Sequence, residues 1–164
     1  MRSLLVRFVL FWVNNVFNGS RFFGIKRGLL RLLGVKIGKG TKIVAPVYFG
    51  PSIAITIGEN CWISMNVFFD GNGAVILGNN IDIAPHVVFN TGGHEIGTPT
   101  RRAGKAKVCT VTVGDGTWIG TRVVIINDVN VSEGVVVAAG AVVHKNVESN
   151  VVIAGVPFQI KKRL

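Results

Sequence analysis

The feature that most constrains this chain is a large apolar side chain that returns at every sixth position. All fifteen members of the series are apolar, namely Ile37, Ile43, Phe49, Ile57, Ile63, Phe69, Leu77, Ile83, Phe89, Val113, Ile119, Ile125, Val131, Val137 and Val143. Smaller side chains follow four positions later, at Thr41, Val47, Cys61, Val67, Val87, Thr117, Val123, Val135 and Ala141. A period of six fits neither a helix nor an open sheet, and it predicts a solenoid of short strands.

Three hexads build one triangular coil of about 18 residues, and the coils stack at the strand spacing of about 4.8 Å. The steps from Phe49 to Ile57 and from Phe69 to Leu77 are eight residues long, so two coils should carry two extra residues at a corner. We therefore expect an all-β solenoid over residues 35–156, with five full coils and a fragment. A long excursion loop, at about residues 90–112, should leave the third coil. Cys61 falls on an inward position, which predicts a buried core thiol.

The first 34 residues differ from the repeat and predict two short amphipathic helices, at residues 3–17 and 22–33. A narrow polar stripe runs along the first helix, formed by Ser3, Arg7, Asn14, Asn18 and Arg21. In the second helix Arg27 and Arg31 lie on one side. Neither segment reaches the ~20 apolar residues of a membrane span. The helices could cap the open end of the solenoid or anchor the chain at a membrane surface, and both can hold at once.

The charge of the chain is strongly positive and unevenly distributed. The formal net charge is +10, and residues 1–42 hold nine Lys or Arg and no acidic residue before Glu59. Such a field suits an anionic membrane surface, a phosphorylated cofactor or a nucleotide-linked substrate. The sequence shows no recognised nucleic-acid-binding motif, so no nucleic-acid partner is expected. Residues 157–164 are predicted to form a basic carboxy-terminal tail. The two cysteines show no metal spacing, which favours a reducing, cytoplasmic compartment.

The excursion between the hexads carries the histidine that is the best candidate for chemistry. Its sequence runs from Phe89 through Gly92-Gly93-His94 to Lys105. Loops that leave a rigid scaffold often hold functional groups, and imidazole titrates near working pH. We expect the two glycines to allow the backbone geometry that presents the ring of His94.

These motifs together resemble a known family. The hexads, the Gly-Gly-His94 loop, the block from Gly114 to Gly120, the block from Val137 to Lys145 and Ile153-Ala-Gly-Val-Pro157 are similar to the left-handed β-helix acyltransferases. The chain looks like the sugar O-acetyltransferases of the galactoside, maltose and nodulation-factor type. Its Arg-Arg-Ala-Gly run after the histidine is closer to the branch that acts in polysaccharide and O-antigen biosynthesis.

The resemblance implies a left-handed helix, a homotrimer with active sites between subunits, and acetyl-CoA as the acetyl donor. His94 takes the place of the family's general base, and Asn66 matches an acceptor-contacting asparagine. Asp70 and Asn72 lie on the same stretch and could orient the sugar hydroxyl. The positions that correspond to the family's cofactor contacts are Trp118, Thr121, Ala139, His144, Lys145 and Lys162. His144 stands where the family has threonine, and Gln159 where it usually has arginine.

The implied activity is transfer of an acetyl group to a sugar hydroxyl during capsule, O-antigen or exopolysaccharide assembly. The implied location is the cytoplasm, with peripheral association at the inner face of the membrane as an option. The main alternative is an N-acetyltransferase of a nucleotide-linked amino sugar. A zinc site through His86, His94 and His144 would need a ligand pattern that these residues do not show, so no metal is expected. A covalent acetyl-enzyme at Cys109 and a non-catalytic membrane-bound scaffold are two further alternatives.

Overall fold

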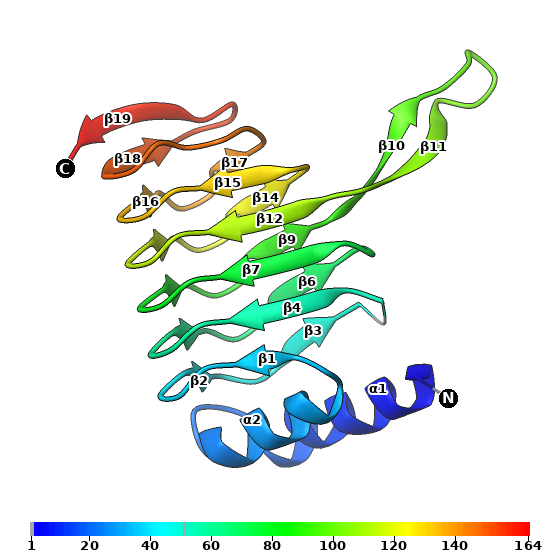
Figure 1. The fold of residues 1–164 in the computed structure, drawn as a ribbon, viewed down its shortest axis with the longest axis vertical. Helices are drawn as coiled ribbons and strands as arrows, with labels where there is room; N and C mark the ends of the chain where they lie inside the picture. Colours follow the sequence, from blue (N-terminus) through cyan, green and yellow to red (C-terminus); the bar gives the residue numbers. More distant parts are fainter. Residues whose placement is uncertain (1, 51) are drawn as a thin grey trace.

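The computed structural model describes residues 2–50 and 52–164, and most of them form a prism of stacked strands (Figure 1). Each coil contributes one short strand to each of three faces, and each strand pairs in parallel with its counterpart in the next coil. Five complete coils are followed by a partial sixth, in which Val147 pairs with Val131. The predicted parallel β-solenoid is confirmed.

The first face consists of β1 (Lys36–Ile37), β4 (Ala54–Ile57), β7 (Ala74–Leu77), β12 (Thr110–Val113) and β15 (Val129–Val131). The second face consists of β2 (Lys42–Ile43), β5 (Trp62–Ile63), β8 (Asp82–Ile83), β13 (Trp118–Ile119), β16 (Val136–Val137), β18 (Val151–Ala154) and β19 (Gln159–Arg163). The third face consists of β3 (Val47–Phe49), β6 (Val67–Asp70), β9 (Val88–Asn90), β14 (Val124–Ile126) and β17 (Val142–Val143).

The core of the prism is the hexad series itself. All fifteen large residues are buried, and so are the nine smaller ones that follow them, including Cys61. Identical or similar side chains stack from coil to coil, because the parallel register places each residue directly over its counterpart. The rings of Phe49, Phe69 and Phe89 stack with centroids 5.1 Å apart at each step.

The corners of the prism follow the chemistry of backbone turns. At the corner between the first and second faces, left-handed conformations recur at Gly40, Asn60, Asn80, Gly116, Gly134 and Asn150. Glycine and asparagine tolerate this conformation best. Both two-residue insertions fall at the corner between the third and first faces, which we call the 3–1 corner. Position 51, in the first insertion, lies outside the described residues.

The excursion from the third coil is an ordered hairpin, whereas the sequence predicted a loop over about 90–112. It consists of β10 (Gly92–Ile96) and β11 (Ala103–Val108), which pair antiparallel and project from the 3–1 corner (Figure 1). Residues 110–113 already belong to β12. The segment predicted as a tail also forms a strand, β19, which runs antiparallel to β18. Without β19, the edge of β18 would expose unpaired backbone groups.

Helices α1 (Arg2–Phe11) and α2 (Phe23–Leu32) lie across the open end of the first coil (Figure 1). The two segments predicted as helical are therefore present, but the first changes to a π-helix, η1, at Trp12–Val16. The backbone N–H of Phe17 bonds to the carbonyl of Trp12, which closes this wider turn. No helix among the described residues is both long and apolar enough to cross a membrane.

The polar side chains of these helices satisfy the backbone groups that the first coil leaves unpaired. Asn14 acts like a strand residue, since its Nδ2 donates to the Val47 carbonyl at 2.8 Å and its Oδ1 accepts from the Val47 N–H at 3.0 Å. Arg27 donates to the Thr41 carbonyl and Arg31 to the Ile37 carbonyl. The inward side of the helices thus combines these hydrogen bonds, which an edge without a further coil requires, with apolar packing by Val9, Val13 and Leu30.

A buried lysine completes this contact. Lys26 is fully buried, donates from Nζ to the Gly19 carbonyl at 2.6 Å, and lies 5.0 Å from the centre of the Phe23 ring. Burial lowers the pKa of Lys26 from its ordinary value of 10.5 to about 8. The carbonyl and the ring partly replace the water that the ammonium group loses.

We expect Asn14→Ala to destabilise the protein by about 1–3 kcal/mol, because a buried donor and acceptor on Val47 lose their partners. Asn15→Ala is the matched control, since the Asn15 side chain is exposed and bonds only within its own helix, to Phe11. Thermal unfolding of the two variants and the wild type measures the difference. Equal melting temperatures for both variants would contradict the proposed strand-like role of Asn14.

Candidate functional site

The hairpin that carries His94 is a compact two-stranded unit held by close glycine packing. Its register pairs Gly93 with Lys107 and His94 with Ala106. A Cβ on Gly97 would come within 2.3 Å of the Arg101 carbonyl, and one on Gly104 within 3.1 Å of the Gly97 Cα. Only glycines allow the two strands to approach so closely near the tip.

The imidazole of His94 is held by one hydrogen bond that decides its protonation pattern. Its Nδ1 lies 2.9 Å from the carbonyl oxygen of Gly104, across the hairpin. A carbonyl oxygen can only accept, so Nδ1 carries the proton and the other ring nitrogen, Nε2, keeps a free lone pair. The side chain is exposed, and its Nε2 is available as a proton acceptor.

The two glycines before His94 have an ordinary extended backbone. Both lie in strand β10, and neither has a positive φ. A Cβ on Gly93 would meet nothing within 4 Å, and one on Gly92 would make only ordinary contacts. The missing side chains instead leave open space beside the imidazole ring.

A cleft of about 280 Å³ opens at the base of the hairpin. Its lining residues are Asp70, Gly71, Asn72, Asn90, Gly92, Gly93, His94, Ala106 and Lys107. The structure thus brings together three of the predicted residues, His94, Asp70 and Asn72. The polar atoms around the cleft could hold and orient a hydroxyl-bearing ligand next to Nε2 of the histidine.

Two residues of this cleft, Asn90 and Lys107, were not predicted. Asn90 pairs in register with Asp70 on the coil below, a relation that the 20-residue spacing of the coils could have revealed. Lys107 lies opposite Gly93 only because the excursion forms a hairpin. Buried Thr91 fixes the cleft floor, since its Oγ1 donates to the Asp70 carbonyl at 2.9 Å and accepts from Gly73 at 3.1 Å.

A second group of predicted residues lies beside the corner between the second and third faces, which we call the 2–3 corner. Trp118, on β13, is 57% exposed and projects from the second face. The Oγ1 of Thr121 donates to the Pro85 carbonyl at 2.7 Å, and Ala139 lies on the next coil. Asn66 also occupies this corner, with a φ of 57°, and is absent from the cleft around His94.

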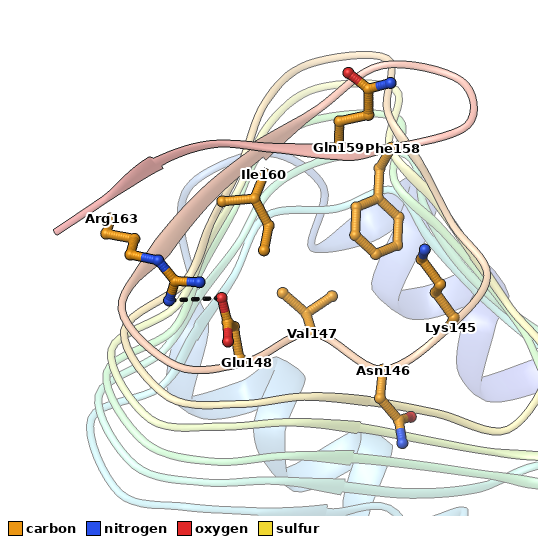
Figure 2. Close-up of a pocket in the computed structure, with 8 residues that line it drawn as sticks. All are labelled: Lys145, Asn146, Val147, Glu148, Phe158, Gln159, Ile160 and Arg163. Carbon is orange, nitrogen blue, oxygen red and sulfur yellow. Dashed lines mark ion pairs between the residues drawn. The ribbon is translucent and has the colours of Figure 1, made fainter.

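A larger cleft of about 590 Å³ lies at the far end of the prism, between the last corner and β19 (Figure 2). Predicted Lys145 lines it, with Nζ 5.4 Å from the centre of the Phe158 ring, and His144 contacts the same ring edge-on at 5.7 Å. Figure 2 also shows Arg163 paired with Glu148, at 2.7 Å. Predicted Lys162 is exposed and does not line this cleft.

The alternatives that rest on other chemistry receive little support from this geometry. Within residues 2–50 and 52–164, no group of three or more His, Cys, Asp or Glu side chains could hold a metal ion. Cys109 is buried, and burial raises the pKa of its thiol, with a further contribution from the Asp128 carboxylate. A thiol kept protonated in this way is not an activated nucleophile.

Comparison with known proteins identifies the family of the chain. No family model matches the chain. The galactoside O-acetyltransferase of Escherichia coli is 31% identical over 139 residues, which cover 85% of this chain and 68% of that protein. A candidate lipopolysaccharide biosynthesis O-acetyl transferase of Escherichia coli is 40% identical over 53 residues, or 32% of this chain and 27% of that protein.

The fold agrees with that match. A solved galactoside acetyltransferase in complex with coenzyme A superposes with a TM-score of 0.85 and 28% identity, over 99% of this chain and 80% of the other. The helical hand is therefore that of the left-handed β-helix acetyltransferases. The sequence match, the hexads and the shared fold lead to one conclusion: the chain belongs to the hexapeptide-repeat acetyltransferases of the galactoside and maltose O-acetyltransferase type, and it is an acyltransferase.

Proposed function

We propose that the chain transfers an acetyl group from acetyl-CoA to a sugar hydroxyl, with His94 as the general base. The observation that carries this proposal is the bond between Nδ1 of His94 and the Gly104 carbonyl, which leaves Nε2 free beside a polar cleft. An alcohol attacks a thioester poorly until its proton is removed, and a neutral imidazole can remove it near pH 7.

The transfer is direct and needs no covalent enzyme intermediate. Nε2 takes the proton of the sugar hydroxyl while the hydroxyl oxygen forms a bond to the thioester carbon. The resulting tetrahedral intermediate collapses with cleavage of the C–S bond, and the proton on Nε2 passes to the departing sulfur. Asp70 and Asn72 would orient the sugar, with Asn90 and Lys107 as further polar contacts in the same cleft.

The donor would lie along the 2–3 corner and reach the far end of the prism. Trp118 offers a broad exposed ring for the pantetheine arm, with backbone groups near Thr121 and Ala139 alongside. His144, Lys145 and Lys162 supply cationic or polar groups near the far cleft for the phosphates of coenzyme A. The relative solved with coenzyme A shares this fold, which supports the choice of cofactor.

We infer that the site is completed between copies of the chain, in a homotrimer of parallel prisms. The base lies at the 3–1 corner, whereas Trp118, Thr121 and Ala139 lie at the 2–3 corner, so the base and this part of the proposed cofactor site occupy different edges of one prism. The projecting hairpin also exposes apolar side chains, with Ile96 91% and Val108 63% exposed. An isolated two-stranded hairpin is marginally stable, and contact with a neighbouring prism would support it.

The acceptor that we favour is a sugar of a surface polysaccharide, such as capsule, O-antigen or exopolysaccharide. Relatives that match the chain include galactoside O-acetyltransferases, and one O-acetyl transferase is described in lipopolysaccharide biosynthesis. These names favour an alcohol over the amine of a nucleotide-linked amino sugar. The chain would work in the cytoplasm, with peripheral association at the inner face of the membrane.

Replacement of His94 by alanine should reduce acceptor-dependent thiol release from acetyl-CoA by about 10²–10⁴-fold, the usual contribution of a general base. The test measures thiol release with a panel of sugar acceptors, and product analysis distinguishes an ester from an amide. Thr98→Ala, at the exposed tip of the same hairpin, is the control and should retain wild-type activity. Full activity in His94→Ala would remove the proposed base.

Replacement of Trp118 by alanine should raise the KM for acetyl-CoA by about tenfold, because the pantetheine arm loses an aromatic surface worth about 1–2 kcal/mol. Trp62→Ala is a matched control, since Trp62 has the same outward position on the second face two coils earlier. Steady-state kinetics at saturating acceptor measures both. An equal rise in KM for the two variants would show that Trp118 has no special contact with the cofactor.

A further inference from the structure

The outer side of the two amino-terminal helices carries many exposed apolar side chains. The inward side already packs Val9, Val13 and Leu30 into the core, so these outer residues have no place in it. They are Leu4, Leu5, Phe8, Phe11, Trp12, Val16, Phe22, Ile25 and Leu32, which we call the outer apolar face. The helices are therefore apolar on the inward side and on much of the outward side, whereas a surface helix that covers a core usually turns polar residues to water.

Aromatic contacts connect the two helices into one patch. The ring of Phe8 lies 6.1 Å from that of Trp12, Trp12 lies 6.1 Å from Phe17, and Phe17 lies 5.6 Å from Phe22. The patch lies at the end of the prism, and Figure 1 shows no element beyond it. Large contiguous apolar patches on a protein surface mark interaction sites.

Positive charge also gathers at this end of the molecule. Exposed basic side chains from the helices and the first coil are Arg7, Arg21, Lys36, Lys39 and Lys42. No acidic residue occurs before Glu59, so the charge of this end of the molecule is uniformly positive. The ion pair between Arg163 and Glu148 lies at the opposite end of the prism.

We propose that this end of the prism docks on an anionic lipid bilayer, with the outer apolar face in the boundary between headgroups and acyl chains. Short helices with Phe, Trp and Leu on one side and basic residues nearby are typical of such interfacial binding. A bilayer with acidic lipids matches both features, since the rings enter the acyl boundary and the lysines and arginines contact headgroups.

This mode of binding differs from that of a free amphipathic helix in one respect. The inward side of the helices is fixed to the prism by hydrogen bonds to Val47, Thr41 and Ile37 and by apolar packing, so the prism itself replaces water on that side. The prism would therefore stand end-on, and the helix layer and two coil spacings would place the hairpin about 20 Å above the membrane. In the proposed trimer of parallel prisms, three caps face one plane and bind together.

The proposal extends the peripheral location given above, but it does not depend on acetyl transfer and is tested separately. Full-chain protein is floated with phosphatidylcholine vesicles, with or without phosphatidylglycerol. We expect flotation with the anionic vesicles and weaker binding to the neutral ones and at high salt. The double variant Phe8→Gln, Phe11→Gln should bind anionic vesicles at least about tenfold more weakly.

The control is a double variant with two exposed apolar residues away from the cap, Ile76→Gln and Leu164→Gln. Their exposed fractions, 43% and 61%, are comparable with the 59% and 58% of Phe8 and Phe11. It should float like the wild type, and all variants should keep the wild-type melting temperature and thiol release with a soluble acceptor. Sedimentation equilibrium without lipid shows whether the outer apolar face instead binds a second copy of the chain.

Three results would overturn the proposal. The first is a wild-type protein that does not float with anionic vesicles. The second is a double variant of Phe8 and Phe11 that floats with anionic vesicles as well as the wild type does. The third is lipid-free association through this face that the Phe8, Phe11 variant abolishes, which would assign the outer apolar face to a second copy. Loss of thiol release alone would instead concern the proposed acetyl transfer.

Discussion

Hydrogen bonding between successive coils is the interaction on which the rest of this molecule depends. The strands of the three faces are short, and most have two to four residues, so one coil cannot be stable without a neighbour. Each end of the stack must then be closed in some other way. At the start, Asn14, Arg27 and Arg31 take over the bonds of a missing coil. At the other end the chain reverses and β19 covers the edge of β18.

The same register builds the candidate site. Insertions at one corner of consecutive coils lie above one another, so the turn after Asp70 meets the base of the hairpin on the next coil. Buried Thr91 ties the two together through its hydroxyl group. A rigid stack thereby holds an exposed histidine and several polar side chains in a fixed arrangement, as proton transfer at a bound hydroxyl requires.

The sequence predicted the repeat well, because every coil offers the same environments and each inward position demands an apolar residue. It also predicted that Asp70, Asn72 and His94 belong together. It did not predict that polar residues of the helices bond to the first coil. Polar side chains of a surface helix usually face water, and here Asn14 and Arg27 instead replace backbone partners. The hairpin was missed because Gly92–Ile96 and Ala103–Val108 hold few of the β-branched and aromatic residues that indicate strands. The strand β19 was missed because it pairs with the edge of β18, which exists only after the coils have stacked.

Active sites between subunits were implied by the family resemblance, whereas the residue pattern by itself gives no sign of them. Residue patterns indicated Trp118, Ala139 and His94 as parts of one function, but one prism places them at separate corners. Distances between copies of a chain leave no periodic signal within it. The outer apolar face is similar in this respect, since apolar residues in a short helix have the same pattern whether they face a core or a lipid surface.

The central claim is that the base of one copy acts on the cofactor held by another. Subunit mixing tests it most directly, by assembling His94→Ala and Trp118→Ala chains in equal amounts and measuring thiol release at low acetyl-CoA. Random assembly with sites between neighbouring copies predicts recovery of about one quarter of the wild-type activity, since some sites receive both intact residues. Activity that stays at the mean of the two separate variants would contradict a shared site and place both residues in one copy.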